Sequence, residues 1–201
     1  MESGIKFKTA GYSGGAIANS VWDDLRVPVV ATKLGGSKDP EFKKVFDNGA
    51  GSQGVFTYLF DAGSEEELYF MVQIPHGWKY ETDIKPHVHW IPTLDGVLGG
   101  VVSWGLEYTL SEIGVTFGNT SFVYGNAHSP SGALVMNKQY ITSLTPISMD
   151  GIDTLSAMLI CRLFRDATGS GLSDTYAWDA GLLEIDFHFE MGSMGSDNEL
   201  S

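Results

Sequence analysis

Hydrophobic and polar residues alternate through most of the chain after residue 52. In Glu67–Ile74, the residues at 68, 70, 72 and 74 are apolar, and Tyr69, Met71 and Gln73 lie between them. A period of two places alternate side chains on opposite faces of a strand, one of them buried. The runs Val102–Leu110 and Leu182–Glu190 share this pattern. We therefore expect strands at all three places, with their apolar faces in one core.

The last alternating run and the apolar run before it complete this picture. In Leu182–Glu190, the pattern places Leu183, Ile185, Phe187 and Phe189 on the inward face. Leu155–Phe164 is almost continuously apolar, which predicts another strand. Cys161, the one cysteine of the chain, lies within that run. A free cysteine among apolar residues behaves as a small buried hydrophobe, and we expect no disulfide.

Residues 39–74 carry two further local predictions. Asp39 before Pro40 is typical of a helix start, and three apolar residues follow at helical spacing, namely Phe42, Val45 and Phe46. This predicts one short helix within Pro40–Phe46. The next alternating run is Val55–Phe60, and a turn-like stretch joins it to Glu67–Ile74. We expect these two strands to form a hairpin.

Together these patterns predict an all-β fold. About eight strands, one short helix and no strand–helix alternation indicate an antiparallel β-sandwich that is jelly-roll-like. Residues 21–191 are expected to form a single domain. The glycine-rich residues 1–20 are interpreted as a flexible N-terminal arm, and residues 192–201 as a mobile acidic tail.

Charge excludes one class of partner. The 201 residues include 12 lysines and arginines against 25 aspartates and glutamates, a formal net charge of −13. Binding to phosphate backbones needs clustered basic residues, so we expect no nucleic acid partner. No run of eighteen apolar residues occurs, and the first residues lack the apolar stretch of a signal peptide. We therefore expect no contact with a membrane.

Two histidines on one strand face are the main chemical feature. His87 and His89 alternate with Val88 and Trp90, so both imidazoles point to the same side. Polar strand faces elsewhere carry Glu107, Arg162, Asp186 and His188. We expect these groups to pair in a hydrogen-bonded polar layer inside the sandwich or between subunits, because buried polar groups need partners.

A metal site is the alternative interpretation. His87 and His89 with Glu107, or with Asp186 and His188, are ligand types for zinc, manganese or iron(II). Cupins present two imidazoles from one strand in this way, and a cupin-like metal-dependent enzyme would follow. The cupin motif, however, has a glutamate shortly after its His-x-His, and Trp90 to Asp95 contain none. We therefore expect no metal.

The loop before the last strand offers a possible contact site. Asp174, Tyr176 and Trp178 could contact a carbohydrate or a partner, since aromatic rings stack on sugars and carboxylates bind hydroxyls. The alternative is that the aromatic pair caps the core. No Gly-x-Ser-x-Gly elbow and no glycine-rich phosphate loop before a helix occurs. We expect no catalytic residues, no cofactor and no enzyme.

Several segments together resemble a set of uncharacterised tailed-bacteriophage virion proteins. They span about residues 22–195 and include Trp22–Pro28, Gly54–Phe60, Gln73–His76, Thr82–Trp90, Leu106–Tyr108, Asp174–Tyr176 and Asp186–Glu190. The resemblance implies a structural protein of the virion, assembled in the host cytoplasm. A capsid decoration (cement) protein is expected first, and a tail or fibre component is the alternative.

The same resemblance implies protein partners. These would be the major capsid protein or other virion subunits. A homo-trimer would place a decoration protein on a symmetry axis of the shell, and a dimer is the second possibility. We expect such an oligomer to use residues 1–20 or the loops within residues 112–153.

Overall fold

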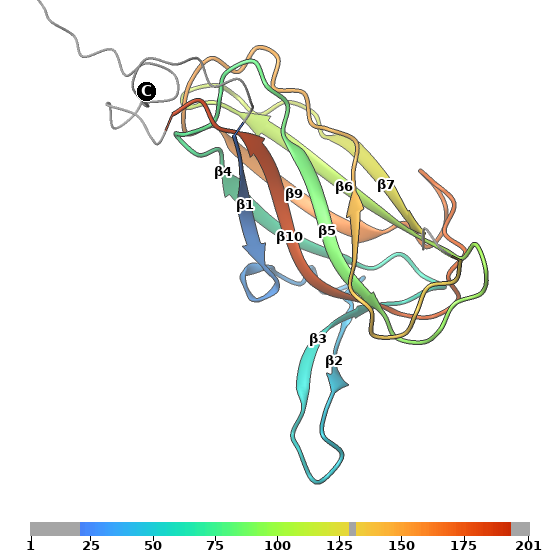
Figure 1. The fold of residues 1–201 in the computed structure, drawn as a ribbon. Helices are drawn as coiled ribbons and strands as arrows, with labels where there is room; N and C mark the ends of the chain where they lie inside the picture. Colours follow the sequence, from blue (N-terminus) through green and yellow to red (C-terminus); the bar gives the residue numbers. More distant parts are fainter. Residues whose placement is uncertain (1–20, 129–131, 194–201) are drawn as a thin grey trace, which may run out of the picture.

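Ten strands make up almost all the regular structure. The computed structural model describes residues 21–128 and 132–193 (Figure 1). The predicted arm, residues 1–20, and residues 194–201 of the predicted tail lie outside the described residues. The strands are β1 (Trp22–Pro28), β2 (Glu41–Phe46), β3 (Val55–Phe60), β4 (Glu67–Gln73), β5 (Lys85–Pro92), β6 (Val101–Ser111), β7 (Ser121–His128), β8 (Tyr140–Ser143), β9 (Met158–Arg165) and β10 (Ala180–Glu190).

Within the described residues, the only helical element is the 3-10 turn Val29–Ala31. None of the described residues forms a helix that could cross a membrane.

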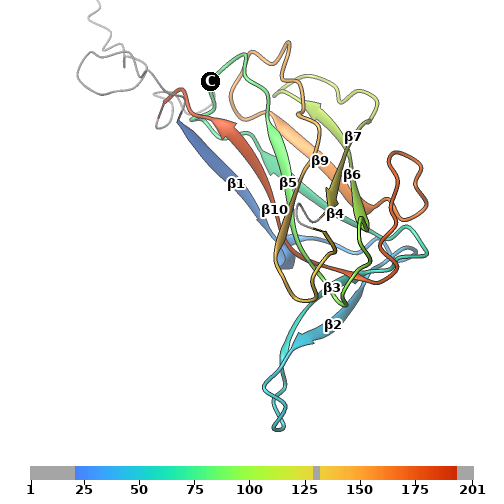
Figure 2. The ribbon, with the colours of Figure 1, turned by 45° about the vertical axis from the view of Figure 1, so that its right-hand side comes forward.

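The strands form two antiparallel sheets that face each other (Figures 1 and 2). One has the order β2-β3-β10-β5-β8, with β1 also paired to β10, and the other has the order β4-β9-β6-β7. If the eight strands from β3 to β10 are numbered 1 to 8, one sheet has the strand order 1-8-3-6 and the other has the order 2-7-4-5. This interleaved order is that of a jelly roll. The predicted sandwich is confirmed.

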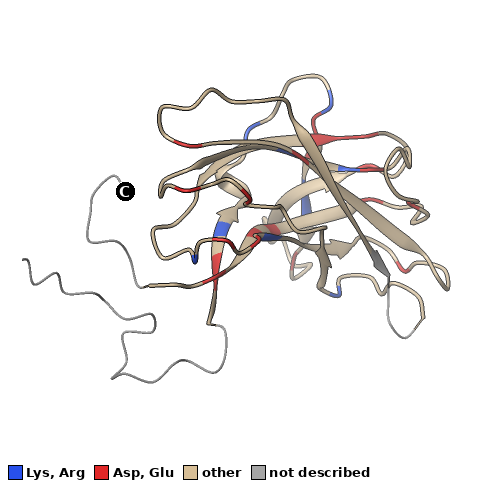
Figure 3. Ribbon diagram, turned by 90° about the horizontal axis from the view of Figure 1, so that it is seen from above, with Lys and Arg blue, Asp and Glu red and all other residues tan. Residues whose placement is uncertain are grey.

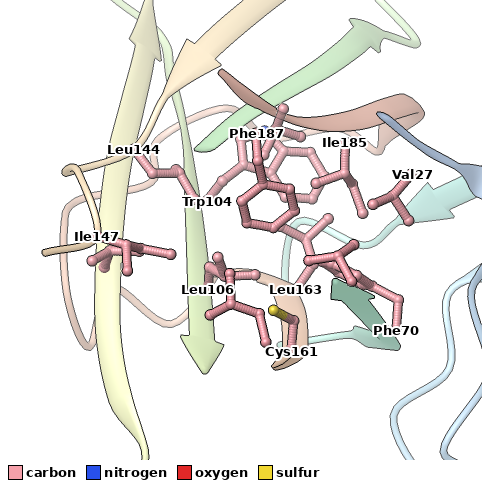
Figure 4. Close-up of a cluster of buried hydrophobic side chains, with 14 of the residues drawn as sticks. Val27, Phe70, Trp104, Leu106, Leu144, Ile147, Cys161, Leu163, Ile185 and Phe187 are labelled. Carbon is pink, nitrogen blue, oxygen red and sulfur yellow. The ribbon is translucent and has the colours of Figure 1, made fainter. Parts of the chain in front are cut away.

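The core lies between the two sheets, as the alternation predicts (Figure 4). Leu68, Trp104, Leu106 and Phe187 are fully buried, and Cys161 packs among them at 2% exposure. These side chains come from β4, β6, β9 and β10, which hydrophobic burial draws together. Burial raises the pKa of the Cys161 thiol to about 12, because an apolar surrounding disfavours the thiolate.

A bulge in β10 corrects the predicted inward face of that strand. The register against β5 shifts between Leu182 and Glu184. Leu182 is therefore fully buried, whereas Leu183 is half-buried and lies on the outer side. From Ile185 onward the predicted alternation holds. An extra residue in one strand exchanges the two faces on either side of it.

The predicted helix within Pro40–Phe46 is wrong. Glu41–Phe46 is strand β2, paired with β3 from Glu41↔Leu59 to Phe46↔Val55. Asp39 caps no helix, and its carboxylate accepts a hydrogen bond from the Gly36 amide at 2.7 Å. The hairpin of β2 and β3 projects beyond the rest of the sandwich (Figure 1).

The predicted hairpin of Val55–Phe60 with Glu67–Ile74 is also wrong. Strand β3 pairs with β2 and with the start of β10 in one sheet, whereas β4 pairs with β9 in the other. Residues 61–66 therefore cross from sheet to sheet. Asp61 shapes this crossing, because its carboxylate accepts hydrogen bonds from the Gly63 amide and the Ser64 hydroxyl.

Candidate functional site

The predicted site residues lie on the outer faces of both sheets, not in a single layer. His87, His89, Asp186 and His188 are on β5 and β10, in the six-stranded sheet. Glu107 is on β6 in the opposite sheet, where it pairs with Arg162. Charged residues are spread over the strands and loops of the sandwich (Figure 3). The fold thus divides the predicted polar layer into two clusters.

The first group, the Asp186 cluster, consists of Asp186, His87 and His89. The register places Asp186 opposite His87 and His89 opposite Glu184, so both imidazoles border one carboxylate. His87 Nδ1 lies 3.1 Å from Oδ1, and His89 Nε2 lies 2.9 Å from Oδ2. The His87–Asp186 distance is short enough for an ion pair, but the geometry is not that of a hydrogen bond, because no donor is aligned with the buried Oδ1. Gln139 Nε2 lies 3.1 Å from His89 Nδ1.

The environment lowers the pKa of Asp186. Its side chain is only 9% exposed, and this burial taken alone raises the pKa. The contacts and electrostatic attraction of His87 and His89 outweigh burial, so the net shift of the Asp186 pKa is downward. The carboxylate is thus held in its charged form by its two neighbours.

Beside this cluster, His188 attaches β1 to the sheet. Its Nδ1 is hydrogen-bonded to the Asp24 carboxylate on β1, and its ring stacks on Trp22 at a centroid distance of 5.0 Å. Lys85 lies 4.2 Å above the same indole. The His87 and His188 rings are 5.6 Å apart. These contacts give the outer face of the sheet a continuous band of paired polar and aromatic groups.

The band does not have the geometry of a metal centre. Among the described residues, no group of three or more histidines, cysteines, aspartates or glutamates could hold a metal ion. The ring nitrogens of His89 lie against Asp186 and Gln139. The arrangement is that of a hydrogen-bonded network on an outer face. Whether a second subunit covers it stays a prediction.

The second group, the Arg162 cluster, lies on the outer face of the four-stranded sheet. Arg162 Nη1 contacts Glu67 at 2.6 Å and Glu65 at 3.2 Å, and its Nε contacts Glu107 at 2.8 Å. Burial lowers the pKa of Arg162, but the three carboxylates outweigh it and the net shift is upward. For Glu107, burial raises the pKa, while hydrogen bonds from Thr120 and Arg162 lower it overall.

A shallow depression of about 460 Å³ lies over the Arg162 cluster. Its lining includes Tyr69, Thr109 and Ile160 beside the charged groups. The volume suits a small ligand, but every charged group in it is already paired with another, Lys38 with Glu65 and Arg162 with the three glutamates. The depression therefore offers shape without a free polar anchor.

The predicted contact loop is mostly turned inward. The side chain of Asp174 is 2% exposed, and both of its carboxylate oxygens accept hydrogen bonds from Arg165 at 2.9 Å. Tyr176 is 2% exposed, and its hydroxyl donates to the Leu94 carbonyl at 2.7 Å. Trp178 alone is exposed, at 49%. Asp174 and Tyr176 are thus not available to a surface carbohydrate.

Sequence reasoning missed the two residues that build this loop. Arg165 is fully buried and donates to the carbonyls of Phe60, Tyr176 and Trp178 in addition to Asp174. Asp166, also fully buried, accepts from the amides of residues 170–172 and from the Ser170 hydroxyl. The available signal was an Arg-Asp pair at the end of an apolar strand, directly before a glycine-rich loop.

No family model and no curated protein matches this chain. Among solved structures, it is similar to the carbohydrate-binding module TmCBM61 in complex with β-1,4-galactotriose. The two are 14% identical over 86% of this chain and 88% of that chain, with a TM-score of 0.31.

Two further structures are similar at the same level. CBM27-1 of Caldicellulosiruptor saccharolyticus, in complex with mannohexaose, is 9% identical over 82% of this chain and 96% of that chain, with a TM-score of 0.34. Infectious bursal disease virus, Gx strain, gives 13% identity over 79% of this chain and 43% of that chain, with a TM-score of 0.26. These values are too low to support an argument about function.

Proposed function

We propose that this chain is a structural protein of a bacteriophage virion, a capsid decoration protein that bridges neighbouring shell subunits. The observation that carries the proposal is the projecting β2–β3 hairpin, which exposes apolar side chains to water. The resemblance of the sequence to tailed-phage virion proteins supports the same assignment.

The hairpin is apolar where a soluble surface is normally polar. Phe42, Phe46, Val55 and Phe56 are 55%, 39%, 59% and 47% exposed. They cover both faces of the hairpin, because Val55 and Phe56 are neighbours on one strand. Exposed apolar groups of this kind mark surfaces that bind other proteins, because covering them removes apolar area from water. A decoration protein that acts as an oligomer needs such a surface outside its own core.

The polar clusters support a structural role over a catalytic one. Arg162 is engaged by three glutamates and Asp186 by two histidines. A catalytic base or nucleophile needs a reactive atom directed at open space. Here, the charged groups hold strands together instead.

We infer that the partners are the major capsid protein or other virion subunits. A decoration protein on a symmetry axis of the shell would act as a homo-trimer, or as a dimer on a two-fold axis. Each stable contact would need to bury on the order of 1,200–2,000 Å² in total. The function would be mechanical, since contacts spread over adjoining subunits hold the shell together.

The test is the copy number of this chain in purified particles of the virus that encodes it. Quantitative mass spectrometry would compare its peptides with those of the major capsid protein. A decoration protein should be present in on the order of hundreds of copies, because symmetry repeats each axis across the shell. A handful of copies would favour the tail or fibre alternative. Absence from particles would refute the proposal.

A further inference from the structure

Two exposed apolar surfaces lie at one end of the sandwich. The first, the hairpin face, consists of Phe42 and Phe56, whose rings stack across β2 and β3 at a centroid distance of 5.6 Å. The second, the loop patch, belongs to the loops after β5 and before β8. It contains Leu94, Val97, Leu98, Val135 and Met136, which are 42%, 73%, 83%, 47% and 44% exposed. Single exposed apolar residues are common, but two groups at one end are not.

The strand pairing places both surfaces at the same end. Phe60, at the base of the hairpin, pairs with Ala180, which on its other side pairs with Pro92. The hairpin and the loop after β5 thus start from neighbouring positions across the same sheet. In Figure 2, both lie at the lower end of the molecule. One rotation axis near this end could therefore bring the hairpin of one copy to the loops of another.

The loop patch is held in a defined shape. Leu98 and Ala133 form a β-bridge, and the Gly96 amide donates to the Leu134 carbonyl at 2.9 Å. The Met136 amide donates to Asp95 Oδ1 at 2.8 Å. The two loops are thus bonded to each other, and a partner that docks here need not order them, which would cost conformational entropy.

Charge favours a second copy as the partner. Two chains of net charge −13 repel unless their contact is nearly neutral. In residues 41–60, Glu41 pairs with Lys43 and Asp47 with Lys44, which leaves no net charge. In residues 93–99 and 132–137, Asp95 is the one charged residue. A contact between these two surfaces therefore adds little repulsion when two identical acidic chains meet.

We propose that the hairpin face of one copy docks on the loop patch of a second copy, in a head-to-tail contact. A hairpin-to-hairpin contact would leave the loop patch uncovered, whereas this contact covers both surfaces. The two surfaces together expose roughly 700 Å² of apolar side chain, more than half of what a small stable interface buries. The proposal deepens the function given above and rests on its oligomer: it assigns the hairpin to the contact between copies, and its test needs no shell.

Two double substitutions separate the two halves of this contact. Phe42→Lys/Phe56→Lys disables the hairpin face, and Val97→Lys/Leu98→Lys disables the loop patch. The matched control is Ile113→Lys/Val115→Lys, because these residues are 59% and 57% exposed. They lie on the loop after β6, whereas the loop patch lies before the other end of β6. All three variants change the charge equally. Light scattering after size exclusion measures the mass of each.

The wild type and the control variant should exceed the monomer mass of 21.8 kDa, and each interface variant alone should be monomeric. An equimolar mixture of the two interface variants should give a species of twice 21.8 kDa. In that mixture, one intact hairpin face meets one intact loop patch, and no further contact can form. Only a head-to-tail interface predicts this rescue.

Three results would overturn the proposal. The first is a wild type that stays monomeric at high concentration. The second is a loop-patch variant that still assembles, which would indicate a hairpin-to-hairpin contact. The third is a mixture that gives no dimer. If lysine at residues 42 and 56 unfolds the hairpin, Phe42→Ser/Phe56→Ser provides a milder variant with the same expected outcomes. None of these results depends on the copy number in particles.

Discussion

The two packed sheets, which form the body of the molecule, and the projecting β2–β3 hairpin differ in where they place apolar side chains. In the body, the apolar side chains of the core are buried between the two sheets, and the fully buried Arg165 donates hydrogen bonds from all five N–H groups of its guanidinium. At the hairpin end, phenylalanines on β2 and β3 face water. The body can fold as a unit, whereas the hairpin gains its favourable contacts only when something covers it. The buried side chains of the body stabilise the fold, whereas the exposed side chains of the hairpin form a surface for binding.

The largest expected effect is in the body. Replacement of Arg165 with methionine would leave Asp174 buried without its partner, and three carbonyls would lose their donor. Removing one member of a buried pair costs about 3–5 kcal/mol of the free energy of unfolding. Urea denaturation measures this loss. Arg26→Met is the control, because Arg26 pairs with Glu184 at the surface and its loss should leave stability nearly unchanged.

A smaller effect is expected on the outer face of the body. Asp186→Asn should lower the free energy of unfolding by about 1–3 kcal/mol at pH 7, because the two histidines lose a charged acceptor. The pKa of Asp186 is lower in the folded chain than in the unfolded one. Its stabilisation is therefore complete above the unfolded value, about 3.9, and disappears as the pH falls through the folded value.

The measurement is denaturation of wild type and variant between pH 7 and pH 2. The stability difference between them should shrink as the solution becomes acidic. Substitution of the exposed Asp150 by asparagine is the control and should show no such convergence. A difference that stays constant down to pH 2 would show that the Asp186 charge does not stabilise the fold.

The smallest effect on folding is expected at the hairpin. Phe56→Ser should change the stability of the monomer by less than about 0.5 kcal/mol, as is usual for an exposed position. Thermal unfolding at a dilution that keeps the chain monomeric tests this. A loss as large as that of Arg165→Met would place Phe56 in the body's core and remove the contrast between the two regions.

Sequence predicted the body better than the hairpin for a physical reason. In strands β4, β6 and most of β10, one face points into the core between the sheets, so apolar residues recur along these strands with a period of two. Strand β2 buries almost nothing, and its Phe42, Val45 and Phe46 match a helix by spacing alone. Because the pattern of β2 predicts a helix, β3 lacks its actual partner in the predicted fold, and the next predicted strand along the chain, β4, takes that place.

The candidate site was predictable by residue type but not by grouping. His87 and His89 could be placed on one strand face because Val88 between them and Trp90 after them are apolar. That Glu107 belongs to another sheet depends on strand order, which local alternation does not encode. The role of Arg165 depends on carbonyls at residues 60, 176 and 178, which only the folded chain brings together.

Hydrogen–deuterium exchange tests most directly the claim that the hairpin end is a surface to be covered. Wild-type protein would be compared at a dilution where it is monomeric and at a concentration where it assembles. We predict slower amide exchange in residues 41–60 and 93–99 on assembly, and unchanged exchange in residues 112–118. Unchanged exchange in the hairpin, with protection elsewhere in the assembled protein, would contradict the account.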